Sequence, residues 1–184
     1  MASKFYYFGF GSNLLAKRLH IQNPTAIRVG PGKLENYSLD FYFPSKRWMG
    51  AAATIVPTKN DHVWGAIWEI DGSDLEHLDN QEGVHEGIYT PITVDVYCPP
   101  FNKHIECRAY HLCRQPEGHL KLIPNEKVPT ERQPSLTYLK TLVKGAQETG
   151  IPLDYVQWLK QIRHNSQVAE YFEKQLDLAD VVLE

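Results

Sequence analysis

Cysteine is scarce in this 184-residue sequence, which contains only Cys98, Cys107 and Cys113. No two of them have the Cys-x-x-Cys spacing of zinc or redox sites, and their number is odd. A disulfide framework is therefore not expected, and a reducing cytoplasm is the expected compartment. Cys107 and Cys113 fall in one strand-like segment, where we expect them to be buried free thiols.

Long apolar runs and an excess of positive charge are also missing. Nineteen Lys and Arg residues stand against 22 Asp and Glu, a net charge of −3, so a nucleic-acid partner is not expected. No apolar run approaches the roughly 20 residues of a membrane-spanning helix, so no membrane partner is expected. The eight histidines include no His-x-x-x-His or His–Cys cluster, which argues against a metal site.

The order of the predicted elements indicates an α+β protein, and a length of 184 residues fits a single domain over residues 1–184. Apolar runs and period-two alternation predict strands over residues 4–10, 34–43, 51–56, 63–70, 89–97 and 104–112. Asn60-Asp61 predicts a hairpin turn, and so does the stretch from Pro99 to Asn102. We expect a largely antiparallel or mixed sheet, with a sheet curled into a barrel as one form that it could take.

Helical signals are short in the first two-thirds of the sequence and dominate the last third. Helices are predicted over residues 14–21, over 74–80 after a Ser73 cap, over 136–148, from Pro152 onward, and over 168–176. Pro134 or Ser135 is expected to start the 136–148 helix, and Gly150 to end it. Residues 114–133 are rich in proline and polar residues, which predicts a long connecting loop.

A short glycine turn, Phe10-Gly11-Ser12-Asn13-Leu14, ends the first apolar run and opens a helical segment. Gly11 would let the backbone approach a ligand, and Ser12 or Asn13 could cap the helix. Free N–H groups at a helix start favour a carboxylate or phosphate. The same pattern also fits an ordinary strand–turn–helix connection without a ligand.

Glu82 is the candidate general base, because Gly83 follows it directly and Gly87 lies close behind. Such an irregular backbone can hold a carboxylate in one place, and aromatic neighbours can raise its pKa toward neutrality. A surface glutamate at a helix end is the alternative, and Glu86 fits that description better. The spacing of Glu82 and Glu86 would also permit glycoside hydrolysis, but nothing else in the sequence indicates a sugar site.

Several segments together resemble gamma-glutamylcyclotransferases, in the same order and over most of the chain. They are Tyr7 to Leu14, Val63-Trp64-Gly65, Leu78 to Val84, Gly87-Ile88-Tyr89, and a C-terminal part from Tyr138 through Lys144-Gly145-Ala146 to Tyr155. The resemblance implies a small mixed β-barrel flanked by helices, and an enzyme that uses no cofactor. Its substrate would be a gamma-glutamyl dipeptide, released as 5-oxoproline and a free amino acid. Homodimers are known in the family, which leaves a homodimer open for this chain.

The resemblance also assigns site residues. It implies that Glu82 is catalytic, and that substrate is bound by Tyr7, Phe8, Gly9, Phe10, Gly11, Ser12, Asn13, Tyr89 and Tyr138. From their sequence context alone, Tyr89 and Tyr138 also fit aromatic residues at the edge of the core. The family usually has tyrosine where this chain has Phe10, and losing that hydroxyl costs on the order of 1 kcal/mol.

This departure keeps a second function open, a non-catalytic protein that binds a gamma-glutamyl or other small carboxylate ligand. Within the enzyme class, a gamma-glutamyl amine or glutathione could replace the dipeptide as substrate. The Gly-Ser-Asn-Leu turn more closely resembles that of the dipeptide-acting type.

Overall fold

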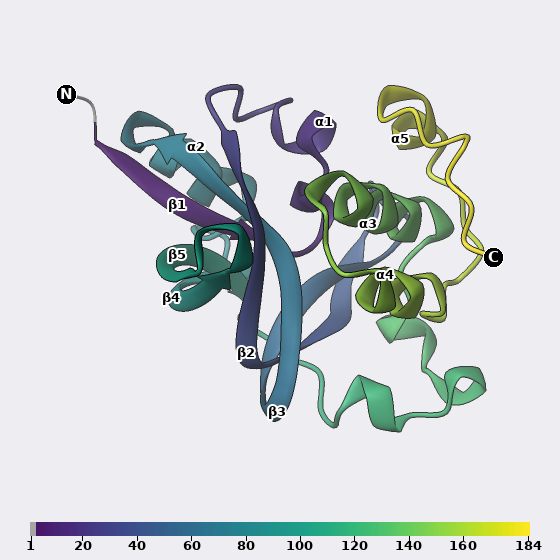
Figure 1. Ribbon diagram of the computed structural model, residues 1–184. Helices are drawn as coiled ribbons and strands as arrows, with labels where there is room; N and C mark the ends of the chain where they lie inside the picture. The colour runs from purple at the N-terminus through teal and green to yellow at the C-terminus, as the bar shows by residue number, and fades with distance from the viewer. Residues whose placement is uncertain (1–2) are drawn as a thin grey trace.

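Five strands form a closed barrel in the computed structural model, which describes residues 3–184 (Figure 1). The strands are β1 (Lys4–Gly9), β2 (Ile27–Ser45), β3 (Gly50–Asp71), β4 (Tyr89–Cys98) and β5 (Lys103–Leu112). They neighbour one another in the order β1-β3-β2-β4-β5. All pairings are antiparallel except that between β1 and β5, which is parallel and makes the sheet mixed.

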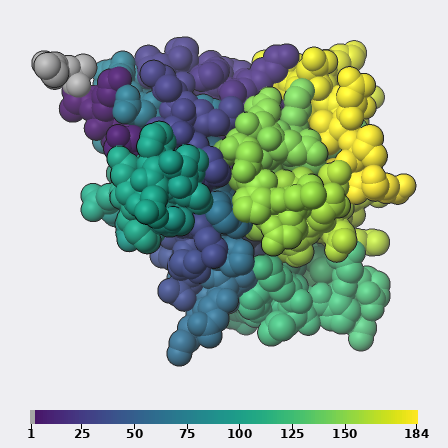
Figure 2. Space-filling view, in the orientation of Figure 1, coloured from purple at the N-terminus to yellow at the C-terminus, as the bar shows by residue number. Residues whose placement is uncertain are grey.

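Five α-helices accompany the barrel in the described residues: α1 (Ala16–Leu19), α2 (Leu75–Gln81), α3 (Leu136–Thr149), α4 (Leu153–Lys160) and α5 (Glu170–Gln175). The C-terminal helices pack together beside the barrel, as the green and yellow surface of Figure 2 shows. The predicted α+β barrel flanked by helices is confirmed. Among residues 3–184, no helix has the length and apolar character that crossing a membrane requires.

The predicted hairpin turn at Asn60-Asp61 is wrong, because β3 runs through it as one strand. The chain reverses instead at residues 46–49, between β2 and β3. Asn60 and Asn36 face each other across the two strands with φ near 65° and 64°, and Asn36 Oδ1 accepts a 3.2 Å hydrogen bond from the Asn60 N–H. The residues with turn chemistry therefore form a bulge, which shifts the register of two long, twisted strands.

The capping predictions for the first two helices are also wrong. Ser12–Leu14 forms a 3₁₀ turn, η1, and α1 is only four residues long, with no side-chain cap on either. The Asn13 amide points instead to the Tyr7 hydroxyl, because a buried amide needs a partner of its own. Ser73 likewise lies inside a second 3₁₀ turn, η2 (Gly72–Asp74), and makes no capping hydrogen bond to α2.

Helix α3 holds the η1 turn in place. Its predicted ends are confirmed: the Ser135 side chain accepts from the Tyr138 N–H, and Gly150 ends the helix with φ of 80°. Gly145 lies directly against the turn, since a Cβ at this position would come within 2.5 Å of the Leu14 carbonyl carbon. Only glycine allows this approach, which fixes the turn relative to Tyr138 on the same helix.

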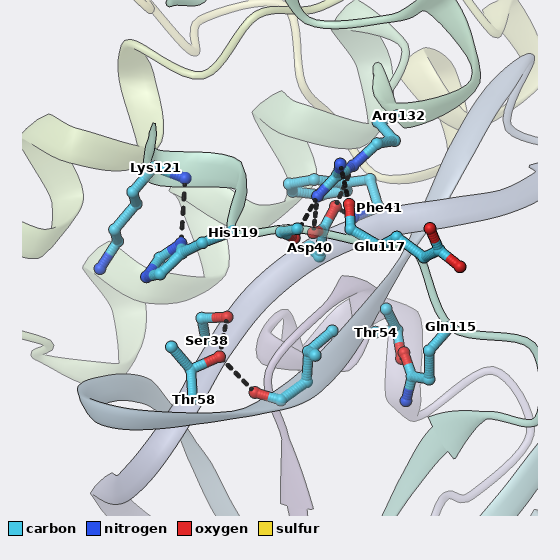
Figure 3. A network of polar contacts seen from close by, with 12 residues as sticks. Ser38, Asp40, Phe41, Thr54, Thr58, Gln115, Glu117, His119, Lys121 and Arg132 are labelled. Atoms are coloured by element: carbon cyan, nitrogen blue, oxygen red, sulfur yellow. Dashed lines mark hydrogen bonds and ion pairs between the residues drawn. The ribbon is translucent and has the colours of Figure 1, made fainter. Parts of the chain in front are cut away.

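The predicted long loop is the β5–α3 connection, residues 113–135, which contains three single-turn 3₁₀ segments. Figure 3 shows how polar side chains attach it to β2 and β3. Arg132 forms an ion pair with Asp40 of β2, and Gln115 bonds Thr54 of β3. Cys113 is exposed, contrary to the expectation, because it lies one residue beyond the end of β5; Cys98 and Cys107 are buried.

Candidate active site

A pocket of about 330 Å³ opens where the β1–η1 turn, the β2–β3 hairpin, α2 and α3 meet. Its wall combines aromatic rings with a few charged and amide groups, a typical composition for a small-molecule site. It is lined by Tyr7, Phe10, Gly11, Ser12, Asn13, Arg18, Gln22, Phe43, Ser45, Arg47, Trp48, Ala52, Ala53, Gln81, Glu82, Tyr89, Tyr110 and Tyr138.

Most of the residues predicted from the sequence meet in this pocket, although they come from distant segments. Phe8 and Gly9 are the two that do not line it. Phe8 alternates with Tyr7 along β1 and is fully buried, with its ring against Gly65. Gly9 lies behind the turn, where a Cβ would meet the Asn13 carbonyl oxygen at 2.9 Å.

Glu82 is held at the C-terminal end of α2, where its N–H donates to the Leu78 carbonyl at 3.0 Å. Gly83 then turns the chain with φ of 66°, the irregular backbone that the sequence predicts. The pKa of Glu82 is raised to about 7, chiefly by burial; Arg18 lowers it and Asp79 raises it. A carboxylate of this kind can accept and return a proton near neutral pH. Glu86 is exposed and does not line the pocket.

Asn13 connects the turn to both β1 and Glu82. Its amide nitrogen donates to the Tyr7 hydroxyl at 2.9 Å and lies 3.5 Å from Glu82 Oε1. Its backbone carbonyl accepts a 2.9 Å hydrogen bond from the Trp68 indole. These contacts fix the turn against the carboxylate, and the Asn13 Oδ1 atom remains buried without a partner among residues 3–184.

Tyr138 and Tyr89 are both tied to the peptide of Ala53. The Tyr138 hydroxyl accepts from the Ala53 N–H at 3.0 Å, and the Tyr89 hydroxyl donates to the Ala53 carbonyl at 2.8 Å. A Cβ on Gly11 would lie 2.9 Å from the Tyr138 oxygen, so glycine is needed for this approach. The two tyrosines thus form a rigid wall beside the turn.

A second polar group supports α2 from the side of the barrel. Asp79 accepts hydrogen bonds from Tyr110 and from Arg108, whose guanidinium makes two contacts of 2.8 Å with its carboxylate. Tyr110 also lines the pocket. The Asp79 cluster therefore fixes both a wall residue and the helix that carries Glu82.

Sequence reasoning missed the cationic side of the pocket, Arg18 and Arg47. One signal was present for Arg18, which shares the apolar face of a short helical segment with Leu14, Leu15 and Leu19. No local signal marks Arg47 and Trp48, because only the reversal between β2 and β3 brings them to the site.

The closed barrel agrees with the comparisons to known proteins. The sequence profile of the AIG2-like family matches residues 62–159, which defines the class. Gamma-glutamylcyclotransferase of Bos taurus is 38% identical over 178 residues, covering 95% of this chain and 87% of that protein. The Homo sapiens gamma-glutamylcyclotransferase is 36% identical with the same coverage. The chain belongs to the gamma-glutamylcyclotransferase family.

Solved structures agree with this assignment. A gamma-glutamyl cyclotransferase structure superimposes with a TM-score of 0.82 at 35% identity, covering 95% of this chain and 99% of that one. A yeast cyclotransferase specific to glutathione, at 13% identity and a TM-score of 0.57, shares the fold alone. The resemblance found in the sequence motifs is therefore confirmed.

Proposed function

We propose that this chain converts gamma-glutamyl dipeptides into 5-oxoproline and a free amino acid, with Glu82 as general base and general acid. The observation that carries the proposal is a carboxyl with a pKa of about 7 inside a pocket that fits a small molecule. Family membership supports an enzyme of the cyclotransferase type. The reaction is intramolecular, so the protein has to position one molecule and move its protons.

Proton transfer is the role proposed for Glu82. Ionised Glu82 takes a proton from the substrate's α-ammonium, and the resulting amine attacks the γ-carbonyl carbon to close a five-membered ring. Glu82 returns that proton to the leaving nitrogen, and the C–N bond to the departing amino acid breaks. A second proton follows the same route from ring nitrogen to leaving amine, so Glu82 ends the cycle ionised.

Positioning and charge stabilisation come from the turn and the tyrosine wall. The first N–H groups of a 3₁₀ turn have no acceptor within it, which makes the Gly11–Asn13 backbone a candidate for the tetrahedral oxyanion. Tyr89 and Tyr138 would keep the glutamyl chain bent, so that the amine lies close to the carbonyl carbon. Tyr7 and Asn13 would hold the Glu82 carboxylate in reach of both nitrogens.

The test is mass-spectrometric detection of 5-oxoproline after incubation with gamma-glutamyl-alanine. We expect product from the natural chain and none above background from Glu82→Gln, which keeps the shape of the side chain but cannot accept a proton. Glu86→Gln is the matched control, because it makes the same change four residues away at an exposed position. Near-normal turnover by Glu82→Gln would refute the assignment of the base.

A second candidate function rests on Phe10, which lines the pocket without the hydroxyl usual in the family. In this case the chain would bind a gamma-glutamyl ligand without turning it over. Measurable binding of gamma-glutamyl-alanine with no 5-oxoproline formed would support it. Parallel assays with glutathione and with a gamma-glutamyl amine would define the substrate class.

We also infer a single domain over residues 1–184, a cytoplasmic location and a homodimer. One continuous apolar core supports the single domain, and three free cysteines fit a reducing compartment. The homodimer rests on the family resemblance. Light scattering of the purified protein would test it, since a dimer has twice the 21.1 kDa mass of the chain.

A further inference from the structure

Arg18 is a buried cation that has no partner in the described part of the chain. Only 6% of its surface is exposed, yet its guanidinium forms no hydrogen bond or ion pair with any of residues 3–184. Its Nε and Nη1 atoms are fully shielded from solvent. Taking a charge out of water without a partner is expensive, so a protein keeps such a group where a ligand supplies the missing charge.

Other buried polar atoms in the described chain lack partners, but they differ from Arg18. Most are single neutral atoms, such as the Tyr155 hydroxyl and Gln175 Oε1. Arg28 has an unpaired Nε, but its Nη2 donates to the Leu14 carbonyl and contacts Glu148. Arg18 is the one case among residues 3–184 in which two nitrogens of the same charged group are buried and unpaired.

The surroundings of Arg18 hold the guanidinium in place without neutralising it. Its Cζ lies 5.8 Å from the centre of the Trp48 ring and 5.6 Å from that of Phe172. These two rings stack on each other at 3.9 Å, so they offer a rigid surface to the cation. Burial and the neighbouring Arg47 lower the pKa of Arg18, and Glu82 raises it by a smaller amount.

Arg18, Arg47 and Glu82 all line the pocket, so it presents two guanidinium groups, of which that of Arg18 is buried, and one carboxyl. In the proposed reaction Glu82 must contact the α-ammonium of the substrate. The α-carboxylate is attached to the same carbon atom and must therefore lie close to Glu82 as well. A zwitterionic α-amino acid group thus matches the Glu82 carboxyl and the buried guanidinium of Arg18, with its ammonium at Glu82 and its carboxylate at Arg18.

We propose that Arg18 binds the α-carboxylate of the gamma-glutamyl substrate, an inference that rests on the proposed function. The α-carboxylate is common to all gamma-glutamyl compounds, whereas the departing residue varies, so a fixed, buried cation suits the former. Arg47 is exposed on the same side of the pocket, toward solvent. With the carboxylate held by Arg18, the N–H groups of the Gly11–Asn13 turn remain available for the oxyanion.

The experiment removes the carboxylates of the ligand one at a time and, separately, the positive charge of Arg18. The first ligand is gamma-glutamyl-alanine; the second is 4-aminobutanoyl-alanine, which lacks only the α-carboxylate; the third is gamma-glutamyl-alaninamide, which lacks the carboxylate of the departing residue. Their dissociation constants are measured by calorimetry with Glu82→Gln and with Glu82→Gln/Arg18→Met. Turnover of the same compounds is measured with the natural chain and with Arg18→Met.

We expect Arg18→Met to weaken binding of gamma-glutamyl-alanine and of the alaninamide by about 10- to 100-fold, the range for a hydrogen-bonded charge. It should have little further effect on 4-aminobutanoyl-alanine, which is bound weakly by both proteins. An equal loss of affinity for all three ligands on Arg18→Met would overturn the proposal. A loss of affinity that is absent only for the alaninamide would also overturn it, because Arg18 would then bind the carboxylate of the departing residue. Because binding is measured without turnover, a chain that binds but makes no 5-oxoproline still tests Arg18.

Two variants separate a binding role from a structural one. Lys17→Met removes the same charge from the neighbouring, exposed position of α1 and should leave all three dissociation constants unchanged. Arg18→Lys keeps the charge and should recover part of the lost affinity for gamma-glutamyl-alanine. Arg18→Lys and Arg18→Met could lose the same affinity for gamma-glutamyl-alanine while both keep the melting temperature of the natural chain. That result would exclude a role for the positive charge.

Discussion

Arg132 and Arg18 are both buried, with 5% and 6% of their surface exposed, but their surroundings are opposite. Arg132 pairs with Asp40 through two nitrogens and also donates to the carbonyls of Glu117 and Gly118 (Figure 3). Arg18 makes no such bond to any described residue and faces the pocket. Burial alone therefore does not indicate the role of a charged side chain. The role is indicated by whether its N–H donors have hydrogen-bond acceptors within the protein.

The difference separates a part of the molecule in which the buried charge is paired from a part in which it is not. The bonds of Arg132 attach the β5–α3 connection to β2, so that a long segment without α-helix or strand has a defined place. Around the pocket, Arg18 and Asn13 Oδ1 lack partners within the described part of the chain, and Glu82 has a pKa far from its usual value. The pocket has thus kept polar groups at some cost in stability, as functional sites commonly do.

The largest expected effect is the loss of stability on substitution of Arg132. Arg132→Met leaves Asp40 buried and unpaired, and should lower the free energy of unfolding by about 3–5 kcal/mol. Arg18→Met removes an unpaired charge and should leave the stability unchanged or increase it. Denaturant titration of both variants measures the difference.

A double variant makes this contrast sharper. Replacing both partners, as Asp40→Leu with Arg132→Met, should recover much of the stability, because no buried charge is left alone. If Arg18→Met lost as much stability as Arg132→Met, the contrast between the two arginines would fail. Arg18 would then be a structural residue.

Glu82→Gln should stabilise the protein in a pH-dependent way. Burial raises the folded-state pKa of Glu82 to about 7 from an ordinary value of 4.5. The stability contributed by the protonated carboxyl is complete below about pH 4.5 and is lost as the pH rises to about 7. At pH 8 the variant should gain about 3 kcal/mol over the natural chain, and near pH 4 it should gain little.

Thermal or denaturant unfolding at the two pH values checks this prediction. Glu86→Gln, at an exposed position, serves as the control and should show no pH-dependent gain. An equal gain at pH 4 and pH 8 would mean that the ionisation of Glu82 is not its source.

A smaller effect concerns the coupling between Arg18 and Glu82. Because Arg18 lowers the pKa of Glu82 and Asp79 raises it, Arg18→Met should move that pKa up and Asp79→Asn should move it down. Shifts of about one unit are expected. Carboxyl carbon NMR of labelled glutamate, with Glu82→Gln to assign the signal, measures both. Shifts of the same sign would show that the two charges do not act directly on Glu82.

The sequence predicted the parts of the site that local patterns encode. The glycine turn, the position of Glu82 before Gly83 and the ends of α3 each follow from a few adjacent residues. The order of the motifs along the chain predicted the barrel fold and the family. The Asn60 bulge was read as a hairpin turn, because the same residue type serves both and only strand pairing distinguishes them.

The cationic side of the pocket could be identified only from the three-dimensional structure. Arg18 becomes distinctive only when its lack of a partner is known, and Trp48 and Phe172 lie far from it in sequence. Arg132 has a similarly ordinary context in the sequence, and only the fold places it on Asp40. Local patterns therefore identified which residues carry chemistry, whereas the packing of distant segments decides which charges are neutralised.

Phe10→Tyr should have the smallest effect on the pocket, because it adds one hydroxyl to the pocket wall. Among residues 3–184, the pocket contains an acceptor without a partner, Asn13 Oδ1, and a carboxyl, Glu82, whose hydrogen-bond donor Asn13 lies at 3.5 Å. A hydroxyl that bonds either group is worth about 1 kcal/mol, which corresponds to roughly a fivefold rise in kcat/KM for gamma-glutamyl-alanine. Turnover that appears only in Phe10→Tyr would identify the natural chain as a ligand-binding protein. Equal turnover in both would show that the cyclotransferase site works without this hydroxyl.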